Sequence, residues 1–296
     1  MVIVPDQPEG RPADQPVVVT TAPDGVAEVR LNRPGSLNAF SDDMFTALIE
    51  AAAQLRVDPG VRAIVLSGNG RAFCSGMDTR AFDMMREAGP GATWRPAGAD
   101  DAAAAIADVD GLALGRGQRA VLIWQTMPVP VIAAVHGAAV GLGLQLALGA
   151  DIRIVAPNAK LGALEVSWGL APDSAGTLLL PRLVGAGRAL ELCATGRVVS
   201  GVEAGQLGLA TAVAEEPHTT AMELARQIAG RSPEAVRSVV RLIRMGAQGC
   251  WQEGLIAERE EMVRNIGSES QREAVAAARE NRPPLFCDPR VTDRRD

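Results

Sequence analysis

Residues 137–145 read Gly-Ala-Ala-Val-Gly-Leu-Gly-Leu-Gln. An apolar run at residues 131–135 precedes them and a small-residue stretch continues to Asp151, which predicts a strand, a glycine turn and a buried helix. Glycine removes the side chains that would keep a ligand away from the N–H groups at a helix start. Because N–H groups that converge on one point stabilise negative charge on an oxygen, the turn predicts an anion or oxyanion site. The stretch ends in an amide, Gln145, where such a site would be expected to carry an acid.

Short strands alternate with helices on both sides of this turn. Strand-like runs at Val17–Thr21 and Val26–Leu31 flank the turn signal Ala-Pro-Asp-Gly and predict a β-hairpin. Ser41 precedes two aspartates and apolar residues at helical spacing, which predicts a capped amphipathic helix over residues 41–56. Further short strands are predicted at residues 63–66, 131–135, 152–155 and 161–162. This alternation indicates an α/β fold with repeated βα crossovers.

The chain divides by composition into a tail, a core and a helical end. Residues 1–16 are proline-rich and acidic, lack the basic and apolar regions of a signal peptide, and are expected to form a disordered tail. Residues 17–200 carry the alternating pattern. Helical patterns dominate from about Arg188, with helix-start signals at Ser200 and Ser232 and helical stretches over 251–265 and 269–281. Residues 201–296 are therefore expected to form a C-terminal helical region that packs on its own core or on a neighbouring subunit.

Composition narrows the class of protein. The 296 residues are 47% hydrophobic but only 3% aromatic, so aliphatic side chains must fill the core. A net charge of −6, with no basic stripe, argues against nucleic-acid binding. No apolar run approaches the roughly 18–20 residues that span a bilayer, so no membrane partner is expected. The four cysteines are scattered without a CxxC pair, which predicts neither a zinc site nor a disulfide framework and suits a cytoplasmic protein.

Seven blocks of sequence, in order along the chain, resemble the crotonase (enoyl-CoA hydratase/isomerase) superfamily. One glycine turn alone would be weak evidence, whereas ordered blocks over most of the chain are specific. The blocks are Leu31-Asn32-Arg33-Pro34 with Leu37-Asn38-Ala39, Ala72-Phe73-Cys74-Ser75-Gly76-Met77-Asp78, Pro130 to Gly137, Gly141-Leu142-Gly143, Ala150-Asp151-Ile152-Arg153, Glu165-Val166 with Gly169-Leu170-Ala171-Pro172, and Glu280 to Phe286.

The resemblance implies a spiral of ββα units with a C-terminal helical trimerisation region, assembled as homotrimers or hexamers. It also implies an acyl-CoA thioester substrate and no metal or other cofactor, coenzyme A being part of the substrate. By position, the oxyanion hole is formed by the N–H groups of Met77 and Leu142, which would hold the thioester oxygen. The positions implied for substrate and CoA binding are Ser36, Asn38, Ala39, Ala72, Gly76, Asp78, Thr79, Gly141, Trp168, Arg282 and Phe286.

The acids depart from the pattern of the family's hydratases, in which two glutamates hold a water molecule. Their positions here are Gln145 and Glu165, and an amide cannot act as a base. Apolar neighbours are expected to raise the pKa of Glu165 by desolvation, the alternative being an exposed carboxylate at a strand end. Asp173 follows eight residues later. The block from Glu165 to Pro181 is most similar to the family's dienoyl-CoA isomerases, but Asp173 is also placed to cap a helix over residues 174–180.

Glu165, with Asp173 and Gln145, is therefore the candidate catalytic set. The favoured reaction is a double-bond shift in an enoyl- or dienoyl-CoA, with an enolate held by the oxyanion hole and Glu165 as the base. Hydration of a 2-enoyl-CoA is one alternative, and a non-catalytic acyl-CoA-binding relative is another. A nucleotide-dependent dehydrogenase is disfavoured, because Gly141-Leu142-Gly143 lacks the third glycine of the dinucleotide motif and lies deep in the chain.

Four other side chains and one loop are weighed against plainer roles. His136 is expected to be a packed, hydrogen-bonded residue rather than a catalytic one, and Cys74 a small buried residue. Trp168 and Trp94 either line an acyl pocket or pack in the core. Residues 84–108, which include Gly and Pro, form either a lid or wall beside the site or an ordinary surface excursion.

Overall fold

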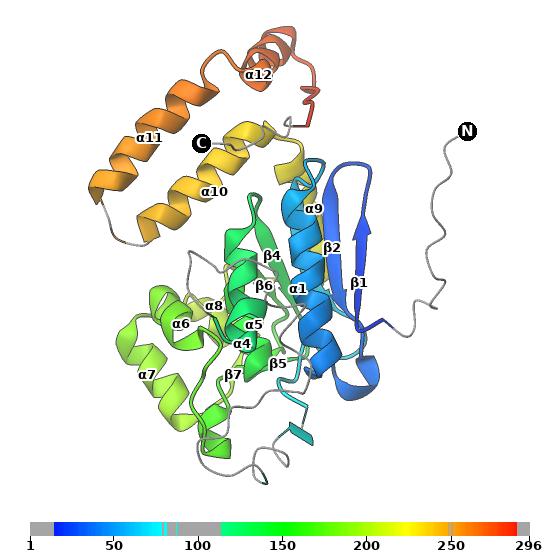
Figure 1. Cartoon of the computed structure of the whole chain (residues 1–296), viewed down its shortest axis with the longest axis vertical. Coiled ribbons are helices and arrows are strands. Elements are labelled where there is room, and N and C mark those ends of the chain that lie inside the picture. Colours follow the sequence, from blue (N-terminus) through cyan, green and yellow to red (C-terminus); the bar gives the residue numbers. More distant parts are fainter. Residues whose placement is uncertain are drawn as a thin grey trace.

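The computed structural model describes residues 15–78, 80–81, 87, 114–247, 249 and 251–288, without the side chains of residues 251 and 252. Its main sheet has six strands in the order β1-β2-β3-β4-β6-β9 (Figure 1). β1 and β2 form an antiparallel hairpin, and every later neighbour pairs in parallel. The strands are β1 (Val17–Thr21), β2 (Val26–Leu31), β3 (Ala63–Gly68), β4 (Val131–Val135), β6 (Ile152–Val155) and β9 (Ala212–Val213).

Both faces of the central strands β2, β3, β4 and β6 are largely buried, and side chains alternate between them as strand geometry requires. On β3, Ile64 and Leu66 enter the larger core cluster, whereas Ala63 and Val65 enter a smaller one. α9 (Pro217–Ala229) covers the smaller cluster. α1 (Asp42–Val57), α4 (Arg116–Leu122) and the short 3-10 helix η2 (Ile123–Thr126) lie on the other face. β9 is an edge strand of the main sheet, and α9 packs on one of its faces. The main sheet and its covering helices therefore include residues after 200.

A second, three-stranded sheet continues the spiral and carries the glycine turn. Its order is β5 (Ala138–Val140), β7 (Lys160–Gly162) and β8 (Val199–Ser200). α5 (Leu142–Gly149) starts directly after β5 and is buried along its whole length. The 3-10 helices η1 (Pro34–Ser36) and η3 (Glu165–Trp168) follow β2 and β7. α6 (Gly176–Val184), α7 (Ala186–Thr195) and α8 (Gly201–Gln206) complete this half of the molecule.

The remaining helices stand at the opposite end of the molecule from α6 and α7 (Figure 1). They are α10 (Pro233–Ala247), α11 (Trp251–Asn265) and α12 (Glu269–Glu280). Arg244 of α10 holds both carboxylate oxygens of Asp151, at 3.0 and 2.7 Å, which anchors the helix to the spiral. Among the helices of the described residues, none is long and apolar enough to cross a bilayer.

Most of the predicted elements are confirmed. The hairpin, the helix after Ser41, β4, β6 and the α/β class agree with the sequence, and Ser41 Oγ accepts from Met44 N as a helix cap. The strand predicted at residues 63–66 continues to Gly68, and the helix predicted over 174–180 begins at Gly176 instead. β5 is missed, because it lies inside the stretch interpreted as a turn. The tail at residues 1–14 and the loop at 88–108 lie outside the described residues.

Candidate active site

Two glycine turns from distant parts of the chain lie against each other. Cys74 N donates to Ala138 O at 2.9 Å, and Val140 N donates to Cys74 O at 3.2 Å. Gly143 has no room for a side chain, since a Cβ there would lie 2.3 Å from Cys74 O. Gly76, at φ +95°, also leaves no room: a Cβ on it would lie 2.8 Å from Val140 O and 3.7 Å from Leu142 N. The glycines thus bring residues 74–77 against the start of α5.

This contact places the N–H groups of Met77 and Leu142 on neighbouring segments. Leu142 is the first residue of α5, so its N–H has no carbonyl within the helix to bind. Within the described part of the chain, neither N–H has a backbone acceptor outside its own element. Two such donors on neighbouring segments, one of them at a helix start, are the kind of arrangement that binds a developing oxyanion. That they bind a thioester oxygen remains a prediction.

Glu165 projects from η3 beside the same turn. A Cβ on Gly141 would lie 3.6 Å from Glu165 Oε1, so glycine leaves the carboxylate an open approach to the start of α5. Glu165 Oε2 is buried and has no hydrogen-bond partner among the described residues. Burial raises the pKa of Glu165, and the nearby charge of Asp173 adds to this, whereas hydrogen bonds from its own backbone and from Gln145 act in the other direction. The predicted desolvated carboxyl is confirmed.

Gln145 lies one turn into α5 and is 2% exposed. Its Nε2 donates to Glu165 Oε1 at 2.7 Å. Its Oε1 accepts from Ser174 N at 2.9 Å and from Gly176 N at 3.0 Å. The amide therefore joins the base candidate to the start of α6.

Asp173 does not cap α6. The N-cap residue is Ala175, which has a positive φ of 66° and no side-chain capping bond, and Gln145 supplies the acceptor instead. The capping alternative is therefore wrong. Asp173 Oδ1 accepts from Ser174 Oγ at 3.1 Å, and the carboxylate is close enough to Glu165 to affect its pKa.

Asn38 ties η1 to the first glycine turn. Its side chain is fully buried, accepts from Arg33 N at 2.8 Å, and donates to Asn69 O and Ala72 O at 2.9 and 2.8 Å. Ala39 and Ala72 are also buried. The Asn38 amide thus has a structural use, and contacts of these residues with CoA would have to come largely from their backbones.

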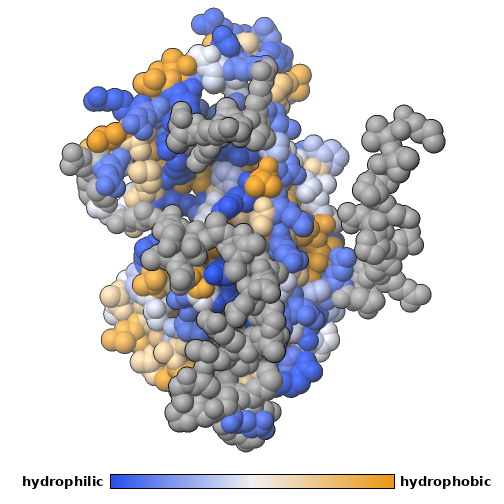
Figure 2. All heavy atoms as spheres, viewed as in Figure 1, coloured by the Kyte–Doolittle hydropathy of each residue, from blue (hydrophilic) through white to orange (hydrophobic). Residues whose placement is uncertain are grey.

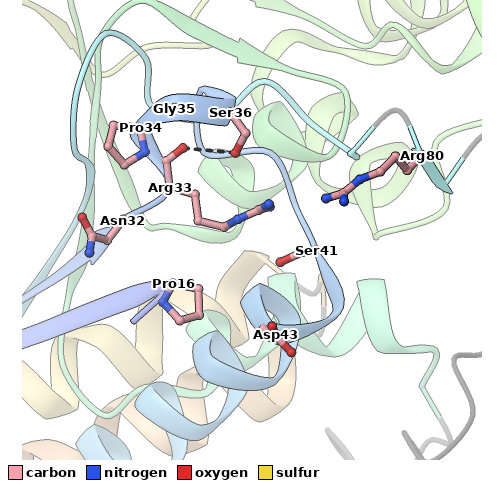
Figure 3. Close-up of a pocket in the computed structure, with 9 residues that line it drawn as sticks. All are labelled: Pro16, Asn32, Arg33, Pro34, Gly35, Ser36, Ser41, Asp43 and Arg80. Atoms are coloured by element: carbon pink, nitrogen blue, oxygen red, sulfur yellow. Dashed lines mark hydrogen bonds between the residues drawn. The ribbon is translucent and has the colours of Figure 1, made fainter. Parts of the chain in front are cut away.

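A polar cavity of about 560 Å³ opens beside Ser36 (Figure 3). The guanidinium groups of Arg33 and Arg80 face each other across it. Both contact Asp78: Arg80 at 2.9 Å and Arg33 at 3.6 Å. The hydrogen bond from Arg80 is the main reason that the pKa of Asp78 falls to about 2. Asp43 also lines the cavity, so the two guanidinium groups stand with two carboxylates and the rim carries no excess positive charge. The guanidinium groups themselves are donors of the kind that bind phosphate.

The structure also places three residues for which the sequence predicted a packing role or left two roles open. Trp168 is 57% exposed, so core packing is excluded and a place beside the acyl chain stays a prediction. Cys74 is buried, as predicted, and burial raises its pKa to about 12. His136 Nε2 lies 3.0 Å from Gly70 O, a hydrogen bond that fits the packed role. Thr79, Trp94 and Cys250 lie outside the described residues.

Arg282 and Phe286 lie far from this site within one subunit. Arg62, just before β3, donates to Phe286 O at 2.8 Å, so the segment is docked at the amino end of that strand. The glycine turns follow the carboxyl ends of β3 and β4, and six residues of strand span about 20 Å. Arg282 is paired with Glu273 and Glu280. Among the described residues, Arg282 and Phe286 therefore stand away from the two glycine turns of the same chain.

Three site features carry no direct sequence signal. The two N–H donors that hold Gln145 lie on either side of Ala175, which has a left-handed conformation. Glycine is the residue that adopts this conformation most easily, so an alanine gives no signal for it. Gly176 matters because a Cβ there would lie 2.7 Å from Gln145 Oε1. Cys193 of α7 lies near Glu165. Burial is the main reason that the pKa of the Cys193 thiol is raised, and the negative charge of Glu165 raises it further. Among the described residues, no three His, Cys, Asp or Glu side chains gather in a metal-binding arrangement.

Comparisons with known proteins agree with this architecture. A sequence profile of the family described as enoyl-CoA hydratase/isomerase matches residues 26–284. The human "Enoyl-CoA hydratase domain-containing protein 2, mitochondrial" is 36% identical over 270 residues, covering 88% of this chain and 85% of the relative. A "Probable enoyl-CoA hydratase" of Bacillus subtilis is 34% identical, covering 88% and 95%. The crystal structure of an enoyl-CoA hydratase from Bacillus anthracis superposes with a TM-score of 0.79 at 30% identity, covering 93% of this chain and 100% of that chain.

Proposed function

This chain belongs to the enoyl-CoA hydratase/isomerase family, whose crotonase fold it has, and we propose from that premise that it shifts a double bond in an enoyl- or dienoyl-CoA. The observation that carries the proposal is the Gln145–Glu165 hydrogen bond. It puts a neutral amide where a second carboxylate would be needed to activate water between two bases. One carboxylate remains beside the start of α5, and one carboxylate suffices to move a proton between two carbons.

The reaction uses the parts in a simple order. The thioester oxygen lies against the N–H groups of Met77 and Leu142. Glu165 removes a proton from Cα of a 3-enoyl-CoA, and the electron pair of that C–H bond moves into the conjugated dienolate. The two N–H groups stabilise the oxyanion, and each such donor is worth about 3–4 kcal/mol in the transition state. Glu165 then returns the proton to Cγ, which gives the 2-enoyl-CoA without gain or loss of atoms.

Asp173 takes part only when the substrate is a dienoyl-CoA, in which two double bonds move. Moving two double bonds of a dienoyl-CoA needs proton transfer at carbons further apart than a single carboxylate reaches. Asp173, on the turn that precedes α6, supplies the second carboxylate there. The cavity at Arg33 and Arg80 receives the phosphates of CoA, with Ser36 at its rim.

The assembly is a homotrimer or a hexamer. Hydrophobic side chains are exposed on α6 and α7 and again on α10 and α11, and Figure 2 shows apolar areas over both ends of this face of the molecule. The residues are Leu178, Leu190, Val239, Ile243, Leu255, Ile256, Met262 and Val263. Burying them between subunits would also bring Arg282 and Phe286 of one subunit towards the site of another.

A substrate panel tests the reaction. Purified enzyme is given 2-enoyl-, 3-enoyl- and 3,5-dienoyl-CoA, and proton NMR follows double-bond position and water addition separately. We expect double-bond migration in at least one of the last two to exceed hydration of the first. Glu165→Gln should lower the rate by on the order of 10²–10⁴, whereas Glu50→Gln, on the exposed face of α1, should not change it.

Three results would contradict the proposal in different ways. Hydration much faster than migration would make the protein a hydratase with Gln145 holding the water. Full activity in Glu165→Gln would remove the base. Binding of acyl-CoA without turnover of any substrate, unaffected by Glu165→Gln, would identify a non-catalytic relative.

A further inference from the structure

The turn before α6 forms a cradle for one oxygen atom. Ser174 N and Gly176 N both point at Gln145 Oε1, at 2.9 and 3.0 Å. Between them Ala175 adopts φ +66°, a conformation unfavourable for a residue with a side chain. The turn is buried, and successive N–H groups arranged in this way bind an electron-rich atom. The unfavourable conformation of Ala175 thus directs the N–H groups of Ser174 and Gly176 at Gln145 Oε1.

The cradle fixes which way the amide of Gln145 points. An amide carries one acceptor oxygen and one donor nitrogen, and only the oxygen can accept the two N–H groups. The nitrogen is left facing Glu165 Oε1, 2.7 Å away. A flipped amide would place NH₂ against two N–H donors and its oxygen against a carboxylate oxygen, losing all three hydrogen bonds.

The amide in turn makes the two oxygens of Glu165 unequal. Oε1 accepts from Gln145, whereas Oε2 is buried without a partner among the described residues. A buried carboxylate oxygen without a donor is costly for stability, so it is a candidate for a group kept for the reaction. A Cβ on Gly141 would have Glu165 within 4 Å but not Gln145, so Gln145 acts on the opening left by this glycine through Glu165.

We propose that Gln145 is a positioning residue: anchored by Ser174 N and Gly176 N, it holds Glu165 through Oε1, fixes the carboxylate beside Gly141, and favours its ionised form. The inference rests on the proposed role of Glu165 as the base. The proton is taken from the substrate carbon by the Glu165 carboxylate and returned from it, and Gln145 keeps its own protons throughout. Within the described ranges, the ionisable groups that interact with Glu165 are Asp173, on the turn, and Cys193, on α7.

Gly176→Ala tests the cradle without changing Gln145 or Glu165. The new Cβ would lie 2.7 Å from Gln145 Oε1 and 2.8 Å from its Cγ, so the amide must move. We expect kcat to fall at least tenfold with KM changed less than threefold, and the acidic limb of the kcat–pH profile to move to higher pH. Gly187→Ala is the matched control, since a Cβ on that glycine of α7 meets nothing within 4 Å. It should leave both quantities unchanged.

A second pair of variants separates donor from acceptor. Gln145→Met removes both functions, whereas Gln145→Glu keeps an oxygen for the cradle but replaces the donor by a negative charge. In both, loss of the N–H to Oε1 should raise the pKa of Glu165, so the acidic limb should move to a pH about one unit higher in Gln145→Met. It should move further in Gln145→Glu, because the second carboxylate repels the charge of the first.

The ionisation of Glu165 can also be followed without substrate. Carbon-13 NMR of the side-chain carboxyls, with Glu165→Gln to assign the signal, gives its titration in wild type, Gly176→Ala and Gln145→Met. An unmoved titration and an unmoved acidic limb in folded variants would overturn the inference, because a purely structural Gln145 changes only thermal stability. Full activity of Glu165→Gln would instead overturn the proposed function and leave the titration result standing.

Discussion

At the scale of single residues, the reaction depends on one ionisation. Burial raises the pKa of Glu165 above its ordinary value of 4.5, and the protonated form cannot act as a base. Activity should therefore be complete above this raised pKa and fall as the pH drops through it. We expect an acidic limb of kcat with a slope of one proton, at a pH above the ordinary glutamate value, measured with the best substrate of the panel. A limb at or below the ordinary value would mean that Gln145 outweighs burial.

Replacing Asn38 is expected to lower the stability of the fold, since its side chain has a structural use and not a catalytic one. Asn38→Ala removes one buried and two partly buried hydrogen bonds and leaves Arg33 N, Asn69 O and Ala72 O without this partner. We expect the free energy of unfolding to fall by roughly 2–4 kcal/mol, measured by urea denaturation. Asn265→Ala is the comparison, because Asn265 makes a single partly buried bond to Ser238 Oγ and should cost about 1 kcal/mol. Equal effects in the two variants would contradict the bridging role of Asn38.

At the scale of elements, the site depends on how closely α5 approaches the first glycine turn. Gly143→Ala places a Cβ 2.3 Å from Cys74 O, a backbone atom that cannot rotate away. The turn and the helix must separate, which misplaces Met77 N relative to Leu142 N. Because a misplacement of about 1 Å can cost 10²-fold, kcat should fall by about that factor.

The control for this variant is Gly246→Ala on α10, where a Cβ meets nothing within 4 Å. It should keep wild-type kcat. Circular dichroism must show that both variants are folded. A folded Gly143→Ala variant with wild-type kcat would mean that the two N–H groups do not act as a pair.

The elements also show what the sequence can predict. β4 is predicted to the residue, because a strand buried on both faces needs continuous hydrophobic sequence. β6 is also predicted to the residue, although Arg153 interrupts its apolar sequence. Gly141-Leu142-Gly143 predicts the helix start that carries one donor. β5 is not predicted, because its pairing with β7 is non-local and its small residues lack a strand signal. The contact of Gln145 with Glu165, twenty residues apart, and the left-handed Ala175 arise from the assembled fold. The glycine turn pointed to Gln145 and the family resemblance paired it with Glu165, whereas no sequence signal pointed to Ala175.

At the scale of the whole molecule, the exposed side chains of α11 predict self-association. Leu255 and Met262 are 60% and 62% exposed and stand seven residues apart, on one side of the helix. Large apolar side chains gathered on one surface mark an interface in a stable protein. Light scattering after size exclusion should therefore give three or six times the chain mass of 30.9 kDa.

Charge on this surface should separate the subunits and expose what the assembly does for the site. Leu255→Glu with Met262→Glu should shift the mass towards 30.9 kDa, whereas Val57→Glu, at a 72% exposed position at the end of α1, should leave the oligomer intact. Since Arg282 and Phe286 lie at the far end of β3 from their own subunit's site, they can assist CoA binding only across a subunit boundary. The dissociated variant should then show a raised KM for acyl-CoA with the acidic limb of Glu165 unmoved. A dissociated enzyme with wild-type KM would place CoA binding within one subunit, at the cavity of Arg33 and Arg80, and a monomeric wild type would contradict the trimer itself.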